Sequence, residues 1–95
     1  MQGKIVFYFR YMGLQFTASK SHITTDSAAA GSAISTGEPH ENRHIAINDD
    51  GTPIPSLTDY FSDRGYSAGV VTLGNLADAT PAAFYAHNIE RDDVR

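Results

Sequence analysis

Two runs of β-branched and aromatic residues open the chain, Lys4–Tyr11 and Leu14–Ala18, with Gly13 between them. Such residues favour strands, and a glycine between two apolar runs favours a turn. The pattern predicts two extended segments, the first buried on one face. Its apolar core, Ile5–Phe9, is far shorter than the roughly 20 residues of a membrane span. It is also too short for the apolar part of a signal peptide.

The composition changes abruptly at Asp26, where small residues begin and continue to Gly37. Asp26 or Ser27 can cap the start of a helix, and Gly37 is placed to end it. The pattern therefore predicts a short helix from about Asp26 to Gly37. Its lack of bulky side chains means that another element can approach it closely, or that it lies under a large sheet.

Two further helices are indicated in the second half of the chain. Ser56 can cap a helix with Asp59 in its first turn, and Gly65 ends it. The apolar face of this helix is Leu57, Tyr60 and Phe61. Thr80 followed by Pro81 is a cap-plus-N1 signature, which predicts a helix running to about His87.

Short strands are predicted between these helices. His44–Asn48 is a candidate strand before the turn signal 49–51, and residues 66–74 contain a nearly continuous apolar run, 68–73. Such runs are typical of buried parallel strands. A helix followed by such a strand indicates the α/β class.

Charge and composition narrow the function classes. The chain has 95 residues, a net charge of -4 and no basic run, which makes nucleic acid an unlikely partner. It has no cysteine, so neither a disulfide nor a thiolate zinc site can form. Its length suits one small domain or part of one.

Ser27 and Arg91 are candidates for phosphate chemistry. A serine at a helix N-terminus lies where unpaired amides and the helix dipole attract an anion. Arg91 could grip two phosphate oxygens with its guanidinium. A plain N-cap at 26–27, and a surface pairing of Arg91 with Asp92 or Asp93, explain the same residues without any site.

Asp78 and Thr80 place a carboxylate and a hydroxyl two residues apart, a plausible contribution to a magnesium site. A capping turn explains both equally well. The four histidines invite a zinc hypothesis, but only two of them are close in sequence, and their segment does not look helical. A metal role for any of them is disfavoured; they are His22, His40, His44 and His87.

The joint pattern is more specific than its parts. Residues 23–37, ITTDSAAAGSAISTG, closely resemble the nucleophile segment of alkaline phosphatases. Residues 69–73 and 78–87, GVVTL and DATPAAFYAH, resemble a second segment of that family, and Arg91 follows at the family's spacing. The resemblance runs from about Gly13 to Arg91. It implies an α/β, three-layer fold with a central, mostly parallel sheet flanked by helices, of which residues 1–95 are a partial domain, incomplete at both ends.

The resemblance also implies roles for single residues. Ser27 would attack phosphorus to give a phosphoserine and would contact a metal, Arg91 would hold the non-bridging oxygens, and Asp26 would orient Arg91. Thr80 matches the direct magnesium ligand. Asp78 matches the residue that holds magnesium largely through water, where some relatives carry histidine. The cofactors implied are two zinc ions and one magnesium.

The resemblance leaves out the family's early Gly-Asp-Gly-Met-Gly-like stretch and its later Asp, Glu and His zinc ligands, which do not occur here. Hydrolysis of phosphate monoesters can demand about 29 kcal/mol of barrier lowering. A helix terminus offers only about 1 kcal/mol. We therefore expect the chain alone to be inactive, and to be marginally stable or aggregation-prone without the remainder.

The first hypothesis is thus a segment of a phosphate monoester hydrolase, with a periplasmic or secreted location implied by resemblance and a homodimeric parent left open. The second is a truncated, non-catalytic phosphate-binding protein. A third, weaker hypothesis makes Ser27 the nucleophile and His87 the base of a serine hydrolase, but no G-x-S-x-G elbow supports it.

Overall fold

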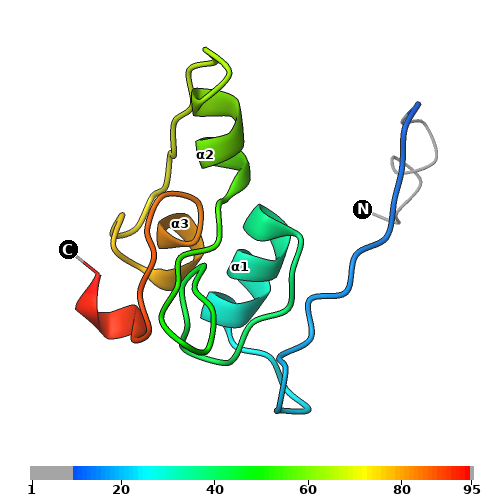
Figure 1. Cartoon of the computed structure of the whole chain (residues 1–95), viewed down its shortest axis with the longest axis vertical. Coiled ribbons are helices and arrows are strands. Elements are labelled where there is room, and N and C mark those ends of the chain that lie inside the picture. The colour runs from blue at the N-terminus through cyan, green and yellow to red at the C-terminus, as the bar shows by residue number, and fades with distance from the viewer. Residues whose placement is uncertain (1–9, 95) are drawn as a thin grey trace.

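The computed structural model describes residues 10–94, which form three α-helices and one short 3-10 helix (Figure 1). The helices are α1 (Ser27–Thr36), α2 (Leu57–Ser62), α3 (Ala79–Ala82) and the 3-10 helix η2 (Arg91–Asp93). The predicted strand Lys4–Tyr11 lies for the most part outside the described residues. None of the helices within residues 10–94 has the length and apolar character needed to cross a membrane.

Helix α1 confirms the first predicted helix and both of its ends. The Asp26 carboxylate accepts a hydrogen bond from the Ala29 amide at 2.8 Å, which caps the N-terminus. Gly37 has φ 80° and donates its amide to Ala33 O at 2.9 Å, so glycine provides the left-handed C-terminal turn. The small residues on its inner face are buried: Ala28, Ala29, Gly31, Ser32, Ala33 and Ser35.

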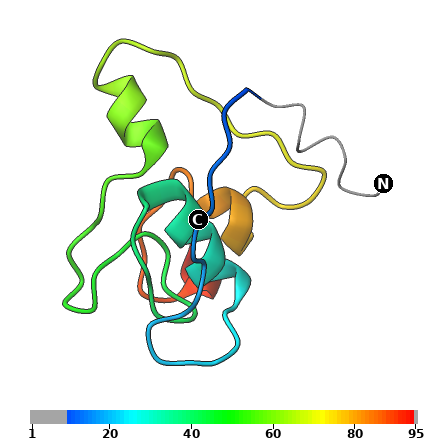
Figure 2. The same ribbon diagram turned by 90° about the vertical axis from the view of Figure 1, so that its right-hand side faces the viewer.

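The small residues of α1 allow α3 to pack directly against it, side by side in both views (Figures 1 and 2). A Cβ atom at Gly31 would lie 3.2 Å from the Cβ of Ala83, tighter than an ordinary contact. Ser35 Oγ donates to Ala83 O at 2.6 Å. The core at this contact is made of Ala28, Ile45, Ala79 and Ala82.

Helix α2 confirms the predicted cap at Ser56. The Ser56 hydroxyl accepts from the Asp59 amide, and the Asp59 carboxylate accepts from the Ser56 amide at 3.0 Å, which completes a capping box. The turn that follows reaches Gly65, which has φ 84°. The predicted apolar face of α2 is not covered, because Leu57, Tyr60 and Phe61 are exposed and no residue of the helix is buried.

Helix α3 is shorter than predicted and begins earlier. Asp78, rather than Thr80, is the N-cap residue, and Pro81 is the third helical residue. Proline fits there because the amides of the first turn have no partner within the helix. After Ala82 the hydrogen bonds tighten, with Phe84 N donating to Pro81 O and Tyr85 N to Ala82 O. The chain then leaves the helix and Asn88 pairs with Ile45, so the prediction of a helix to His87 is wrong.

The predicted sheet is not formed within residues 10–94. That region has only three isolated bridges, which join Ser19 to His40, Ile45 to Asn88 and Ile47 to Pro53. The segments 14–18 and 66–74 run extended without pairing, and the side chains of Val71 and Leu73 are fully exposed. A buried parallel strand needs neighbours on both sides and covering elements on both faces. The described residues supply neither.

Candidate functional site

Hydrogen bonds to its carboxylate and from its amide hold Asp26 at the start of α1. Its Oδ1 accepts from Ala29 N at 2.8 Å and its Oδ2 from Arg43 N at 2.8 Å. Its own amide donates to Asn42 Oδ1 at 3.0 Å, and Asn42 is itself fixed by a bond to Thr24 O. Ser27, the first helical residue, is exposed. The local structure therefore fixes the backbone immediately before Ser27 and leaves Ser27 open to solvent.

Arg91 reaches this helix end from the other end of the chain. Its Nη1 lies 3.6 Å from Asp26 Oδ2, and both side chains are about three-quarters buried. Of the three residues proposed as catalytic on resemblance, the structure brings Arg91 to Asp26, and Ser27 directly follows Asp26 in the chain. Asp92, one of the surface partners considered for Arg91, instead binds Arg43 at 2.6 Å.

The start of α3 lies at the same end of the helix pair as Ser27. Ala28 packs with Ala79, Gly31 lies against Thr80 and Ala83, and Ser35 bonds to Ala83, so the two helices run in the same direction. Asp78 shares a cleft of about 190 Å³ with Arg91, lined by Asn75, Ala77, Asp78, Ala79, Arg91, Asp92 and Val94. Thr80 lines a different hollow, beside Val70 and Phe84.

The residues at this end fit a hard cation better than zinc. Asp78 occupies the N-cap position, yet its side chain makes no capping hydrogen bond, which leaves the carboxylate available to a ligand. Carboxylate and hydroxyl oxygens are the donors that magnesium prefers. Within residues 10–94 no three His, Asp or Glu side chains are grouped to hold a metal ion. Either metal, magnesium or zinc, would therefore need further ligands in addition to the residues described here.

Two of the four histidines, His40 and His87, make hydrogen bonds to the backbone of the fold. His87 contacts Ala46 O through Nδ1 at 2.7 Å and Asp59 Oδ2 through Nε2 at 3.3 Å, so neither ring nitrogen is left to serve Ser27 as a base. This argues against the serine hydrolase hypothesis. His40 is buried, with Nδ1 2.8 Å from Glu38 O, and burial lowers its pKa.

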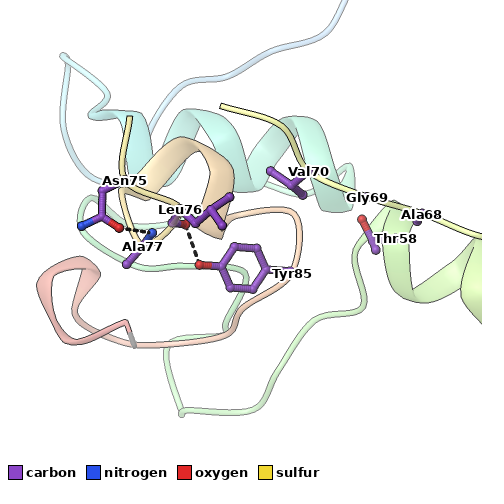
Figure 3. Close-up of a pocket in the computed structure, with 8 residues that line it drawn as sticks. All are labelled: Thr58, Ala68, Gly69, Val70, Asn75, Leu76, Ala77 and Tyr85. Atoms are coloured by element: carbon purple, nitrogen blue, oxygen red, sulfur yellow. Dashed lines mark hydrogen bonds between the residues drawn. The ribbon is translucent and has the colours of Figure 1, made fainter. Parts of the chain in front are cut away.

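An apolar cleft of about 570 Å³ lies between α2 and the segment that leads to α3 (Figure 3). Tyr85 closes one side of it, with its hydroxyl donating to Leu76 O at 2.5 Å. Neither Ser27 nor Arg91 lines it; its walls are Thr58, Ala68, Gly69, Val70, Asn75, Leu76, Ala77 and Tyr85. The cleft is lined by no carboxylate, histidine or arginine, so we do not assign the phosphate chemistry to it.

Three residues of the site, Asn42, Arg43 and Glu90, were not found from the sequence. Asn42 and Arg43 lie in a polar loop, and nothing in their spacing marks them. Arg43 adopts φ 69°, a left-handed conformation that is uncommon for a residue with a side chain. An Asn in a polar loop is a weak signal for a turn, but it does not reveal which helix end the loop meets.

Comparisons with known proteins decide the family. A family model described as alkaline phosphatase matches residues 4–95. The chain belongs to the alkaline phosphatase family. It is similar to streptomycin-6-phosphate phosphatase of Streptomyces griseus, with 44% identity over 68 residues, covering 70% of the chain and 15% of that relative. It is also similar to alkaline phosphatase 4 of Bacillus subtilis, with 39% identity over 74% of the chain and 15% of the relative.

Solved alkaline phosphatases share the fold. A mutant of TAB5 alkaline phosphatase with Mg bound in the M3 site matches with a TM-score of 0.80 and 33% identity, over 94% of the chain and 29% of that structure. Alkaline phosphatase of Thermus thermophilus matches with a TM-score of 0.76 and 38% identity, over 84% of the chain and 17% of that structure. The chain therefore has an alkaline-phosphatase-like fold, and it spans less than a third of each of these relatives.

Proposed function

We propose that residues 1–95 are the nucleophile-bearing segment of an alkaline phosphatase domain that hydrolyses phosphate monoesters through a phosphoserine at Ser27. The observation that carries this proposal is the ion pair between Asp26 and Arg91. The guanidinium of Arg91 lies 3.6 Å from Asp26, the N-cap residue of α1, and the exposed Ser27 follows Asp26 in the chain. Family membership supports the same reaction class.

Ser27 would attack phosphorus through its hydroxyl oxygen, and the leaving alcohol would depart on the opposite side. The phosphoserine would then be cleaved by water, which releases phosphate and restores Ser27. The helix end helps to hold the anion, although the amides of Ala29 and Ala30 already donate to Asp26. Fewer amides are therefore free for phosphate, and Arg91 must supply most of the grip on the non-bridging oxygens.

Asp26 would act as the positioning partner of Arg91. Its Oδ1 accepts from Ala29 N, and its Oδ2 accepts from Arg43 N and lies 3.6 Å from Arg91 Nη1 in an ion pair. A carboxylate held in this way keeps the long arginine side chain in one rotamer and reduces the entropy lost when phosphate binds.

The residues that would hold magnesium are Asp78, whose carboxylate makes no capping hydrogen bond, and Thr80, which is included on the family resemblance because it lines a different hollow from Asp78. Two zinc ions belong to the same proposal for the whole enzyme, with ligands other than the residues described here. Bound metals would supply the charge that activates the serine oxygen and stabilises the leaving oxygen. A periplasmic or secreted location and a homodimeric assembly rest on resemblance alone and stay predictions.

The proposal is tested by hydrolysis of a chromogenic phosphate monoester in the presence of zinc and magnesium. The 95-residue chain is compared with the chain extended by its flanking coding sequence, each with a Ser27→Ala control. We expect activity in the extended protein, its loss in the control and none in the short chain. Inactivity of the extended protein, with phosphate still bound, would favour the alternative of a non-catalytic phosphate-binding protein.

A further inference from the structure

Arg43 connects the two halves of the candidate site. Its amide donates to Asp26 Oδ2 at 2.8 Å, so its backbone belongs to the start of α1. Its φ of 69° lies in the left-handed region, where a residue with a Cβ is disfavoured. Glycine would provide this backbone and this hydrogen bond with less strain. The side chain of Arg43 therefore needs a separate explanation.

The guanidinium of Arg43 binds the two carboxylates that flank Arg91. Its Nε donates to Glu90 Oε1 and Oε2 at 2.9 and 3.0 Å, and its Nη2 donates to Glu90 Oε1 at 2.5 Å and Asp92 Oδ2 at 2.6 Å. The hydrogen bonds between Arg43 and Glu90 lower the pKa of Glu90 and raise the pKa of Arg43, which favours the charged form of both groups. Multidentate charged contacts of this kind impose geometry as well as attraction.

Within residues 10–94, removal of this guanidinium would leave Glu90 and Asp92 without a cationic partner other than Arg91, and Glu90 would keep only the hydrogen bond from Asp92 N at 3.3 Å. Asp26, Glu90 and Asp92 carry three negative charges, and Arg43 and Arg91 carry two positive ones. Without Arg43 the balance of the five residues falls from -1 to -2. The free carboxylates would compete for Arg91 and repel an approaching phosphate, since like charges a few ångströms apart disfavour each other.

We propose that Arg43 is a positioning residue for phosphate binding, which neutralises Glu90 and Asp92 so that Arg91 remains available to the substrate. The inference rests on the proposed function, because it assigns Arg91 to phosphate. Arg43 acts here through the carboxylates and does not itself touch the phosphate. Two of its nitrogens, Nε and Nη2, are already committed to carboxylates.

The test uses the extended, metal-loaded enzyme with inorganic phosphate as competitive inhibitor and a chromogenic monoester as substrate. Arg43→Gly keeps the left-handed backbone and the amide bond to Asp26 while it removes the guanidinium. We expect KM and the inhibition constant of phosphate to rise about tenfold, the equivalent of about 1.4 kcal/mol, with kcat changed less than threefold. Arg43→Lys keeps the positive charge but loses the planar, two-pronged guanidinium, so its KM and its inhibition constant for phosphate should lie between those of the wild type and of Arg43→Gly.

Neutralising the carboxylates provides the decisive comparison. In the Arg43→Gly background, Glu90→Gln with Asp92→Asn should restore most of the phosphate affinity, because the competing charges are gone. A guanidinium that bound phosphate directly, or that only stabilised the fold, would not be replaced in this way. Thermal unfolding of each variant separates a loss of folded protein from a loss of affinity.

Two results would overturn the inference while the proposed function stands. The first is an active wild type whose phosphate affinity does not change in Arg43→Gly. The second is a loss of affinity in Arg43→Gly that the carboxylate substitutions do not restore. A wild type that neither hydrolyses the monoester nor binds phosphate would instead refute the proposed function, and the inference would fall with it.

Discussion

Two regions of the molecule differ in how well their side chains are paired or buried. The first is the corner, which we define as the start of α1 with Asp26, Asn42, Arg43 and Arg91; the second is the pair of extended segments, 10–18 and 66–76. At the corner, Asn42 and Arg43 form hydrogen bonds with Asp26, and Arg91 forms an ion pair with it. Small residues pack α1 closely against α3. Along the extended segments, large apolar side chains such as Leu14, Phe16 and Leu73 are fully exposed. In segment 10–18 the side chain of Gln15 reaches α1, where it donates to Ala33 O, and the N-terminal part of the segment extends away from the helices (Figure 1). The geometry at the start of α1 is therefore set by contacts within residues 10–94, whereas these residues provide no cover for the large apolar side chains of the extended segments.

Arg91→Ala is the substitution expected to damage the corner most. Without the guanidinium, the enzyme loses its grip on the phosphate oxygens, and we expect kcat/KM of the extended enzyme to fall about 10²- to 10³-fold. Steady-state kinetics measure this. Arg64→Ala is a matched control, because Arg64 stacks on Tyr60 and donates to Tyr60 O, away from the site. An equal loss in both variants would contradict the assignment.

Gly31→Leu tests the seal between α1 and α3. The Cβ position is already 3.2 Å from Ala83, so a leucine would force the helices apart, and we expect a loss of about 3 kcal/mol in the free energy of unfolding. Denaturant unfolding of the extended protein measures it. Gly13 has nothing within 4 Å of its Cβ position, so Gly13→Leu should change stability little. Equal effects at the two positions would mean that the helices do not pack as described.

Leu73→Ser tests whether the extended segment 66–76 is covered in the longer protein. In the 95-residue chain the side chain is exposed, so we expect a stability change within about 0.5 kcal/mol and less aggregation. In the extended enzyme we expect a loss of about 2 kcal/mol, because the side chain would be buried there. Parallel unfolding and light-scattering measurements decide this. An equal change in stability in the two proteins would indicate that segment 66–76 is not buried in the extended enzyme.

The smallest expected effect concerns the capping box of α2. The Ser56 amide, and then the charge of His87, lower the pKa of Asp59 in the folded chain. A carboxylate whose folded pKa is depressed stabilises the fold above its unfolded pKa, about 3.9, and this contribution is lost as pH falls through the folded value. Asp59→Asn should therefore flatten the pH dependence of unfolding below about pH 4. An unchanged acid limb would contradict the role of the cap.

The sequence alone predicted those features that depend on neighbouring residues. Asp26, Gly37 and Ser56 are caps whose hydrogen bonds span at most four residues, and all three act as expected. The end of α3 could not be predicted because it depends on the pairing of Asn88 with Ile45, a long-range contact. The extended segments had the composition of strands, but composition does not supply the partner strands. The described residues form no sheet, so that prediction is not confirmed.

The site residues, like the fold, divide into those that a local sequence pattern indicates and those that depend on long-range contacts. The resemblance singled out Asp26 and Arg91, and the structure places them 3.6 Å apart, although their function stays a proposal. Arg43 was not identified from the sequence, because its proposed role depends on a left-handed backbone conformation and on carboxylates far away in the sequence. Neither property leaves a local pattern. Charge networks assembled from separate loops are therefore the part of this site that required the structure.

The central claim is that Ser27 carries the phosphoryl group, and acid quenching of the extended enzyme during turnover tests it most directly. Peptide mass spectrometry of the quenched protein would locate the modified residue. We predict phosphate on the peptide that contains Ser27, and none in the Ser27→Ala variant. Phosphate on another residue, or an active enzyme that never becomes phosphorylated, would contradict the account.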